Sequence, residues 1–586
     1  MRTKFIAISM ASVLACGLMA GCNGGVEYEP EEDAKLSYLY VDTAPGGFGS
    51  EYLSVVAKAF ETANAGKSYA ENKMGVKIEV GESATNKDVN FKTGVGSSPS
   101  DVHVVEGLYY TDLLKDNSIL KLTDIVTDTL SDGKTIEGKL NTEQKRVLKY
   151  NNEYYTIPTF AGYTGLTYNA DLFKNNNLFF ADSTESPDAT SSYTGKAYTG
   201  RPLVRNQSTK KSPGPDGLYN TDDDGLPSSY EEFFYLYDSM LDASPSITPM
   251  ILYGGHYSNY IFQELLCAAS TANELSSMFS FDSNGEEVEI ITGWNNDGTP
   301  KTENVVITEE NGYKSTMQVS KYMATKFIKH LSTNQVNGKS YIDSRSRGQS
   351  LSNTNAQKLF MESSLDPSQT PIATLVEGVY WYNESAGTRE GMAGTYGEDV
   401  ENMNLKYMPL PAQEYGTVSE NNGTVSENNR TTQLVADSLQ YYLVINAKVA
   451  NNKEKLDLAK DFVKFMYSDE MLQKMTVTSG IPFALKYDLT DTQYNSMNTL
   501  SQSFWNVYKG AKDNDAYITG LSLSPTFLAN TARFSFKSTN NAFKSKVNGA
   551  ETEDALGYFY NNKSVSARDF FTGMSIDSEN WANYKK

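Results

Sequence analysis

Residues 36–41 read Leu-Ser-Tyr-Leu-Tyr-Val, residues 46–49 read Gly-Gly-Phe-Gly, and an apolar pattern follows over residues 52–60. The first segment predicts a β-strand, because aromatic and branched residues favour extended backbone. The glycines predict a loop that can bring backbone close to a ligand. Tyr52, Val56 and Phe60 then recur at helical spacing, and Ser50 is placed to cap the helix. A strand, a glycine loop and a helix together make one α/β unit.

The same pattern continues outward from this unit. Residues 76–80 and 101–105 are further strand candidates, and residues 110–114 open another helix. Strands that alternate with helices through short loops favour a mostly parallel sheet. Ligands of such sheets bind outside the carboxyl ends of the strands. We therefore expect chemistry in the loops that follow these strands.

Several blocks farther along the chain match, in order, the pattern of one protein family. They are Tyr-Tyr-Thr-Ile-Pro-Thr-Phe at 154–160 with the glycines and Leu-Thr-Tyr-Asn-Ala-Asp-Leu-Phe that follow up to 173, Pro-Ser-Ser-Tyr-Glu-Glu-Phe at 227–233, Leu-Val-Glu-Gly-Val-Tyr-Trp at 375–381, Met-Pro-Leu-Pro at 408–411, the strand at 442–446 with the helix at 459–470, and Gly-Ile-Pro at 480–482. The chain resembles the family 1 extracellular solute-binding proteins in these blocks. It departs from them at Trp381, which comes one position later than usual, while Tyr380 stands in the expected place.

The resemblance implies an α/β fold of the periplasmic-binding-protein type II kind, a maltose-binding-protein-like arrangement of two lobes joined by several hinge crossings. It implies lobe 1 over 36–160 and 436–482, and lobe 2 over 161–435 and 483–586. It also implies a monomer that carries a carbohydrate to the membrane permease of an ABC importer. The ligand-binding residues expected from it are Phe48, Glu106, Tyr110, Tyr155, Phe160, His256, Glu377, Tyr380, Trp381, Tyr382 and Asn383. Trp381 is the ring expected most strongly to stack on a sugar.

Composition supports a neutral ligand better than a polyanion. The chain has 51 Lys plus Arg against 72 Asp plus Glu, which makes its formal net charge -21. This charge opposes general nucleic-acid binding, which needs a basic face. Aromatic residues make up 12 % of the chain, and aromatic faces can stack on the C–H faces of sugars. The supply of rings and the long insertions favour an oligosaccharide over a monosaccharide.

The N-terminal segment is typical of an export signal. Arg2 and Lys4 precede an apolar stretch over 5–20, and Leu-Met-Ala-Gly-Cys at 18–22 resembles a bacterial lipobox. We expect a signal peptide over 1–21, lipidation with palmitate at Cys22, and an acidic tether over 22–35. The protein would then stand lipid-anchored on the extracytoplasmic face of the bacterial cell membrane. A soluble secreted form or a mere signal anchor is the alternative. Cys267, in an apolar run, is interpreted as a small buried hydrophobic residue.

An acidic loop at 220–231 reads Asn-Thr-Asp-Asp-Asp-Gly-Leu-Pro-Ser-Ser-Tyr-Glu. It fits the twelve-position EF-hand-type pattern, in which alternate oxygen ligands, a glycine at the sixth place and a closing carboxylate hold Ca²⁺. The ligands expected for a structural Ca²⁺ are Asn220, Asp222, Asp224, the carbonyl of Leu226, and Glu231. A solvated acidic turn that serves the following helix is the alternative.

Two regions resemble insertions into the two-lobe arrangement. One carries the calcium loop, over about 180–232. The other, over about 270–310, has the turn signals Asp-Ser-Asn-Gly at 282–285 and Asn-Asp-Gly at 296–298 between strand-like segments, which predicts β-hairpins. A polar heptad at 416–422 is repeated at once at 423–429, which is typical of a lengthened surface loop.

The sequence shows no catalytic signature. His103, His256 and His330 are scattered, and no H-E-x-x-H, G-x-S-x-G or Walker A motif is present. We therefore expect a binding protein and no enzyme. Two alternatives stay open: an exported glycan-acting enzyme, whose paired carboxylates the 72 acids could supply by chance, and a peptide-binding or adhesive surface lipoprotein.

Overall fold

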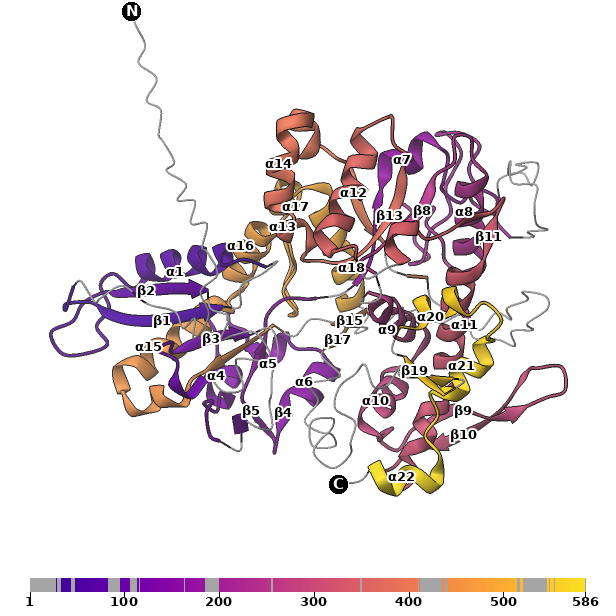
Figure 1. Cartoon of the computed structure of the whole chain (residues 1–586). Coiled ribbons are helices and arrows are strands. Elements are labelled where there is room, and N and C mark those ends of the chain that lie inside the picture. Colours follow the sequence, from indigo (N-terminus) through magenta and orange to yellow (C-terminus); the bar gives the residue numbers. More distant parts are fainter. Residues whose placement is uncertain are drawn as a thin grey trace, which may run out of the picture.

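The computed structural model describes residues 28, 33–43, 48–82, 95–105, 113–114, 116–162, 164–184, 200–254, 257–347, 350–408, 410–411, 435–437, 441–513, 517–519, 545–547, 549–552 and 554–584. Two separate β-sheets organise these residues (Figure 1). The indigo N-terminal strands lie in one sheet, and the magenta and red strands lie in the other. We call the first sheet with its helices lobe 1 and the second with its helices lobe 2.

The sheet of lobe 1 has the strand order β2-β1-β3-β16-β6. Its strands are β1 (Ser37–Thr43), β2 (Val76–Glu82), β3 (Val102–Val105), β6 (Ile157–Pro158) and β16 (Tyr442–Ile445). β1 runs parallel to both β2 and β3, as expected from the alternating pattern. β16 is antiparallel to both β3 and β6, so one strand of this sheet is reversed. The lobe's helices are α1 (Glu51–Ala63), α4 (Thr123–Thr127), α5 (Ile136–Lys139), α6 (Thr142–Leu148), α15 (Lys453–Met466) and α16 (Asp469–Ser479).

The sheet of lobe 2 has the order β14-β7-β13-β8. Its strands are β7 (Thr164–Asn169), β8 (Thr248–Ile251), β13 (Ile372–Gly378) and β14 (Leu405–Met408). Here β7 is antiparallel to both β13 and β14 and is the reversed strand. The lobe's longer helices are α8 (Tyr230–Asp242), α9 (Ser258–Ala269), α11 (Val319–Thr333), α12 (Asn353–Leu365), α14 (Ala386–Tyr396) and α18 (Thr499–Asp513), and its shorter ones are α7 (Ala170–Asn175), α13 (Trp381–Glu384), α17 (Asp491–Ser496), α20 (Ala555–Asn561), α21 (Ala567–Gly573) and α22 (Ser578–Tyr584).

The two reversed strands are the ones by which the chain enters a lobe from the other. β7 follows the passage out of lobe 1 after β6, and β16 follows the passage out of lobe 2 after β14. A strand that enters from the far lobe starts at the junction and runs away from it, so its direction is opposite to strands that end there. The junction is thus where strand ends of both lobes meet, and the functional residues are to be sought there.

The segment around 270–310 contains α10 (Ala272–Ser280) and one hairpin, formed by β9 (Glu287–Trp294) and β10 (Pro300–Val306). Phe281 ends α10 in a left-handed conformation, and Asn284 and Gly285 supply the positive φ angles of the turn before β9. The hairpin stands out from the rest of lobe 2 in Figure 1. It packs a small core of its own, built on Val288, Ile290 and Ile307.

Helix α1 confirms the helical spacing read from the sequence but not its predicted cap. Tyr52, Val56 and Phe60 are buried against the sheet. Ser50 has helical backbone angles and its side chain accepts no cap hydrogen bond, so the predicted N-cap is wrong. A capping side chain needs extended backbone at this position to reach the free N–H groups.

Among the described residues, no helix is long and apolar enough to cross a membrane.

Candidate functional site: the junction of the lobes

Four aromatic rings from four segments meet between the lobes. The Phe48 ring, just after β1, stacks on Phe160 with centroids 4.2 Å apart, and its centroid lies 4.4 Å from that of Tyr441. Tyr380, just after β13, reaches the same ring from lobe 2, at 5.9 Å. Phe48 and Phe160 are buried and Tyr380 is half-buried. The sequence predicted Phe48, Phe160 and Tyr380, and the structure brings them together.

Gly378 makes room for the ring of Tyr380. A Cβ atom built on this glycine would lie 2.2 Å from Cε1 of Tyr380, far inside contact distance. The glycine at the end of β13 therefore lets the tyrosine fold back over the strand end. This explains, in terms of space, why the Glu-Gly-Val-Tyr sequence places its tyrosine at the junction.

Trp381 differs from its predicted role. Its side chain has no exposed surface, and its indole N–H donates to Oγ1 of Thr167 on β7 at 2.8 Å. In this conformation it is a core residue that ties α13 to the sheet, so it offers no face to a sugar. Tyr380 and Trp381 are consecutive residues at the start of α13, so their side chains point in different directions. The ring of Tyr380 points to the junction, and that of Trp381 points into the core.

The neighbouring predicted residues are in contact with protein groups. The guanidinium of Arg389 lies 3.6 Å from the ring centre of Tyr382, whose hydroxyl donates to Glu401 at 3.0 Å. Asn383 donates from Nδ2 to the carbonyl of Ser479 at the end of α16, at 2.8 Å. This last bond joins lobe 2 to lobe 1. Tyr155 is half-buried against a hydrophobic core to which both lobes contribute residues.

Glu377 is a buried acid in a polar cluster at the end of β13. Its Oε1 accepts from Nε2 of Gln357 at 3.0 Å, and the same amide donates to Oε2 of Glu384 at 2.8 Å. Burial, reinforced by the nearby Glu384 and only partly offset by the bond from Gln357, raises the pKa of Glu377 to about 8. Oε1 of Gln357 is buried and has no hydrogen-bond partner among the described residues. A protonated carboxyl and a spare acceptor suit hydroxyl recognition.

Sequence reasoning missed Glu264 of α9. Its Oε1 accepts the backbone N–H of Thr164 at 3.2 Å, and burial raises its pKa to about 8. Thr164 of β7 pairs with Gly378 of β13 at the junction end of both strands. Glu264, which is bonded to Thr164, and Glu377, which precedes Gly378, therefore both lie at the junction. The signal was a single carboxylate within the apolar run Ile-Phe-Gln-Glu-Leu-Leu at 261–266. Tyr441, the other missed residue, had no signal beyond its place before a strand.

Three predicted ligand residues, Glu106, Tyr110 and His256, lie outside the described residues. Cys22 lies outside them as well, and so does the side chain of Cys267.

The predicted calcium loop is a tight turn whose carboxylates have other partners. Asn220 and Gly225 have φ angles of +65° and +84°, as the tight loop requires. The side chain of Asp222 accepts from Nζ of Lys406 at 3.0 Å, and Asp224 accepts the backbone N–H of Asn220 at 2.9 Å. Within the described part of the chain, no group of three or more His, Cys, Asp or Glu side chains is placed to hold a metal ion. In this arrangement a calcium site would require Asp222 to leave Lys406.

A segment at 483–488 is held by both lobes near the junction. The carbonyl of Ala484 accepts from Gln144, and the backbone N–H of Lys486 donates to the carbonyl of Lys139, both at 2.7 Å and both from lobe 1. From lobe 2, Nζ of Lys512 on α18 donates to the carbonyl of Tyr487 at 2.7 Å.

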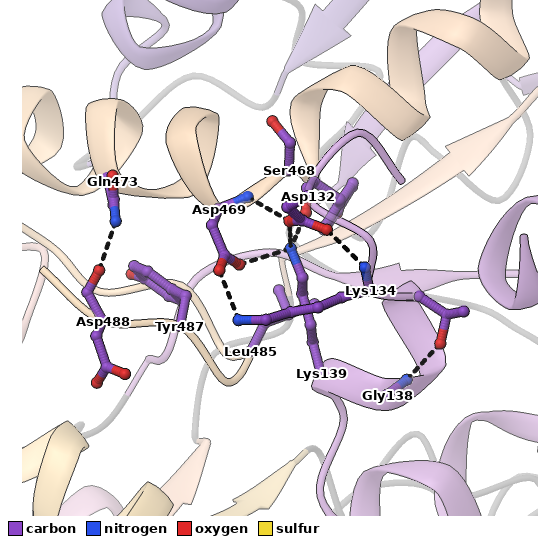
Figure 2. A network of polar contacts seen from close by, with 12 residues as sticks. Asp132, Lys134, Gly138, Lys139, Ser468, Asp469, Gln473, Leu485, Tyr487 and Asp488 are labelled. Carbon is purple, nitrogen blue, oxygen red and sulfur yellow. Dashed lines mark hydrogen bonds and ion pairs between the residues drawn. The ribbon is translucent and has the colours of Figure 1, made fainter. Parts of the chain in front are cut away.

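Figure 2 shows why Lys139 is fixed. Its ammonium is buried and lies 2.7 Å from Asp132 and 2.8 Å from Asp469. Burial disfavours ionisation of Asp132, but bonds from Lys139, Lys134 and Asp469 outweigh it and lower its pKa to about 2. A buried ion network therefore anchors the crossing segment.

A solved chitin oligosaccharide binding protein has a similar fold: it is 13% identical, the match covers 93% of this chain and 98% of that chain, and the TM-score is 0.50. A sugar transporter from Rhizobium etli in an open conformation is 15% identical over 93% of this chain and 99% of that chain, with a TM-score of 0.48. The GacH receptor of Streptomyces glaucescens is 15% identical over 94% of this chain and 98% of that chain, with a TM-score of 0.46.

No protein-family model matches the chain. No curated protein sequence matches it either. The chain has the two-lobe periplasmic-binding-protein type II fold, as predicted from its resemblance to the family 1 extracellular solute-binding proteins.

Proposed function

We propose that this protein is a family 1 solute-binding protein that captures a sugar between its lobes. The observation that supports this most is the set of rings at the junction, where Phe48 of lobe 1 and Tyr380 of lobe 2 approach within 5.9 Å. Rings from both sides can stack on the two faces of a sugar, and the buried carboxyls beside them can bond its hydroxyls. The similar fold is that of a protein named for binding chitin oligosaccharides.

We infer that the ligand is a neutral oligosaccharide and that the protein binds it without chemistry. Glu377 and Glu264 have raised pKa values, so each is largely protonated at neutral pH and can donate to a hydroxyl without carrying a charge. Trapping of the sugar would bias an open and closed equilibrium of the lobes, and the permease of an ABC importer would receive the loaded form.

The location and the metal belong to the same proposal. Lipidation at Cys22 would place the protein on the outer face of the cell membrane, as the lipobox-like 18–22 supports. Ca²⁺ would be held by Asn220, Asp222, Asp224, Glu231 and the carbonyl of Leu226, and would replace Nζ of Lys406 at Asp222. The spacing of these residues and the positive φ of Gly225 support this assignment.

A glycan screen tests the function. Mature protein is screened by thermal shift against neutral oligosaccharides, chitin oligosaccharides among them, and hits are titrated by calorimetry. Saturable binding that Tyr380→Ala weakens by about 10-fold or more, or about 1.4 kcal/mol, is expected. Tyr396→Ala, at the far end of α14, is the matched control. Peptide binding in place of sugar binding, or release of hydrolysed glycan, would contradict the proposal.

A further inference from the structure

Lobe 2 contains a cavity that the ring cluster does not share. Its volume is about 390 Å³, within the range of small-molecule sites. It is enclosed by the end of β7, α7 and the following turn, residues 204–211, the acidic loop at 221–224, and the start of β14. The buried rings of Tyr168 and Phe179 contribute apolar surface to it.

Three lysines surround this cavity: Lys174, Lys211 and Lys406. Lys406 has an ion-pair partner, Asp222, at 3.0 Å. Neither Lys174 nor Lys211 has a carboxylate within ion-pair distance in the described part of the chain, and Nζ of Lys211 lies 3.3 Å from the ring centre of Phe179. Burial lowers the pKa of Lys211, the charges of Lys406 and Lys174 lower it further, and Asp224 opposes this. The lining therefore holds three lysines against two aspartates, Asp222 and Asp224, and Lys174 and Lys211 are the two lysines that form no ion pair there.

The carboxylates that line the cavity and the side-chain oxygen of Asn206 already accept hydrogen bonds within the protein, while donors are left over. Asp222 accepts from Lys406 and Asn506, and Asp224 accepts backbone N–H groups of the acidic loop. Oδ1 of Asn206 accepts from the N–H and the hydroxyl of Ser208, at 2.9 and 2.6 Å, which leaves its amide N–H groups for another partner. An anion with several oxygens would supply the acceptors that this set lacks.

The remaining amides favour hydroxyl groups on the same ligand. Nδ2 of Asn177 donates to the carbonyl of Arg205 at 3.2 Å, and Nδ2 of Asn404 donates to Asp171 at 2.9 Å. The side-chain carbonyl oxygens of these two residues are then the acceptors that a hydroxyl could meet. Cations, amide donors, amide acceptors and an apolar floor together match a molecule that has both an acid group and hydroxyls.

We propose that this cavity is a second ligand site, which binds a small acidic sugar, a sugar acid or a sugar phosphate, with its anionic group on Lys174 and Lys211. The site lies outside the ring cluster at the junction and is independent of the neutral oligosaccharide proposed to bind there. It gives the protein a means to sense or retain a charged sugar on lobe 2.

Calorimetry of the mature chain in EDTA tests the site, with D-glucuronate, glucose 6-phosphate, inorganic phosphate and D-glucose as separate probes. EDTA keeps the acidic loop free of metal. We expect saturable binding of glucuronate or glucose 6-phosphate, weakened about 10-fold or more in the double variant Lys174→Met, Lys211→Met. Methionine keeps the length and apolar stem of lysine. Lys339→Met, an exposed lysine of β12 (Lys339–Ser340), is the control and should bind like the parent protein.

The outcomes separate this proposal from the function at the junction. No binding of either acidic sugar, or full binding by the double variant, would overturn it, and so would equal affinity for D-glucose. Inorganic phosphate binding as tightly as glucose 6-phosphate would overturn the sugar part. Neutral oligosaccharide binding should be the same in parent and double variant. If the double variant does not fold, the single variant Lys174→Met replaces it and should also bind glucuronate more weakly than the parent protein. Added salt should likewise weaken glucuronate binding to the parent protein, because screening weakens an exposed charge contact.

Discussion

Glu264 is the residue whose environment differs most from what its sequence neighbours suggest. Its carboxyl is buried on α9, where its Oε1 accepts the backbone N–H of Thr164. Burying a carboxylate without a cation beside it costs free energy, so burial raises the pKa of Glu264 to about 8. Glu377, on β13, is also a buried carboxyl, and burial raises its pKa to about 8 as well.

This raised pKa makes the stability of the protein fall as pH rises. Between the unfolded pKa of Glu, about 4.3, and the folded value of about 8, the native state binds more protons than the unfolded state. The contribution of Glu264 to the free energy of unfolding is therefore fully present below about pH 4.3 and is lost as the pH rises to about 8. Glu264→Gln should leave the Tm at pH 5 nearly unchanged and raise the Tm at pH 8. Glu390→Gln, at an exposed position on α14, is the control; parallel curves for parent and E264Q would contradict the assignment.

A substitution of Trp381 can distinguish a role in the core from a role in ligand binding. Because its indole is fully buried and bonded to Thr167, Trp381→Ala should destabilise the fold by about 3–5 kcal/mol. Urea denaturation measures this, and Tyr382→Ala, whose ring is only half-buried, should cost less. An unchanged urea midpoint for W381A, with sugar affinity lost instead, would restore the stacking role predicted from sequence.

At this scale the sequence predicted residue neighbourhoods better than side-chain directions. The structure brings Phe48, Phe160 and Tyr380 together because the loops after strands of both lobes reach one place, and their role in ligand binding stays a prediction. Trp381 was misassigned because motif position does not say which of two consecutive rings turns inward. Glu264 carries no motif, and only its pairing to Thr164 across the fold places it at the junction.

The end of β13 is the element on which the proposed sugar site depends. A Cβ at Gly378 would overlap the ring of Tyr380, which must then swing away from Phe48. Gly378→Ala should weaken oligosaccharide binding by about 10-fold, measured by calorimetry. Gly387→Ala on α14 is the control, because a Cβ there meets open space. Unchanged affinity in G378A would show that the position of Tyr380 is not needed for binding.

The acidic loop at 220–231 is the element for which the proposed metal can be tested directly. At the proposed site Ca²⁺ would compete with the Lys406 ammonium for Asp222, so the variant Lys406→Met should bind Ca²⁺ more tightly than the parent protein. Calorimetry with Ca²⁺, and melting curves with and without EDTA, measure this. Asp222→Asn should lower the affinity. Absence of Ca²⁺ binding in both parent and K406M would identify the loop as a turn closed by its lysine.

Strands and helices of the first unit were predictable, because periodicity reports burial on one face. The direction of β7 and β16 was not: each sheet is mostly parallel, as expected, but contains one reversed strand. Periodicity is the same for a strand read in either direction. The reversal follows from which lobe the chain comes from, a long-range property that local pattern does not encode.

At the scale of the whole molecule, the net charge of -21 and the chain length suggested a solvated body of several units. The structure divides the chain into two lobes and an anchored crossing at 483–488. Lys139 and Gln144 hold this crossing on one side and Lys512 on the other. The crossing is therefore tied by hydrogen bonds to both lobes.

Two contacts bridge the lobes at the proposed sugar site. They are the ring pair Phe48–Tyr380 and the bond from Asn383 to the carbonyl of Ser479. Their removal in Tyr380→Ala, Asn383→Ala takes stabilisation away from the close arrangement and leaves Phe48 packed on Phe160 and Tyr441, so the equilibrium moves toward separated lobes. Small-angle X-ray scattering of the ligand-free double variant should then give a larger radius of gyration than that of the parent protein. The double variant Tyr382→Phe, Lys339→Met, which leaves both contacts in place, is the control. Equal radii for the bridge variant and the parent would mean that these contacts do not hold the lobes together, and the proposed capture between them would lose its mechanical basis.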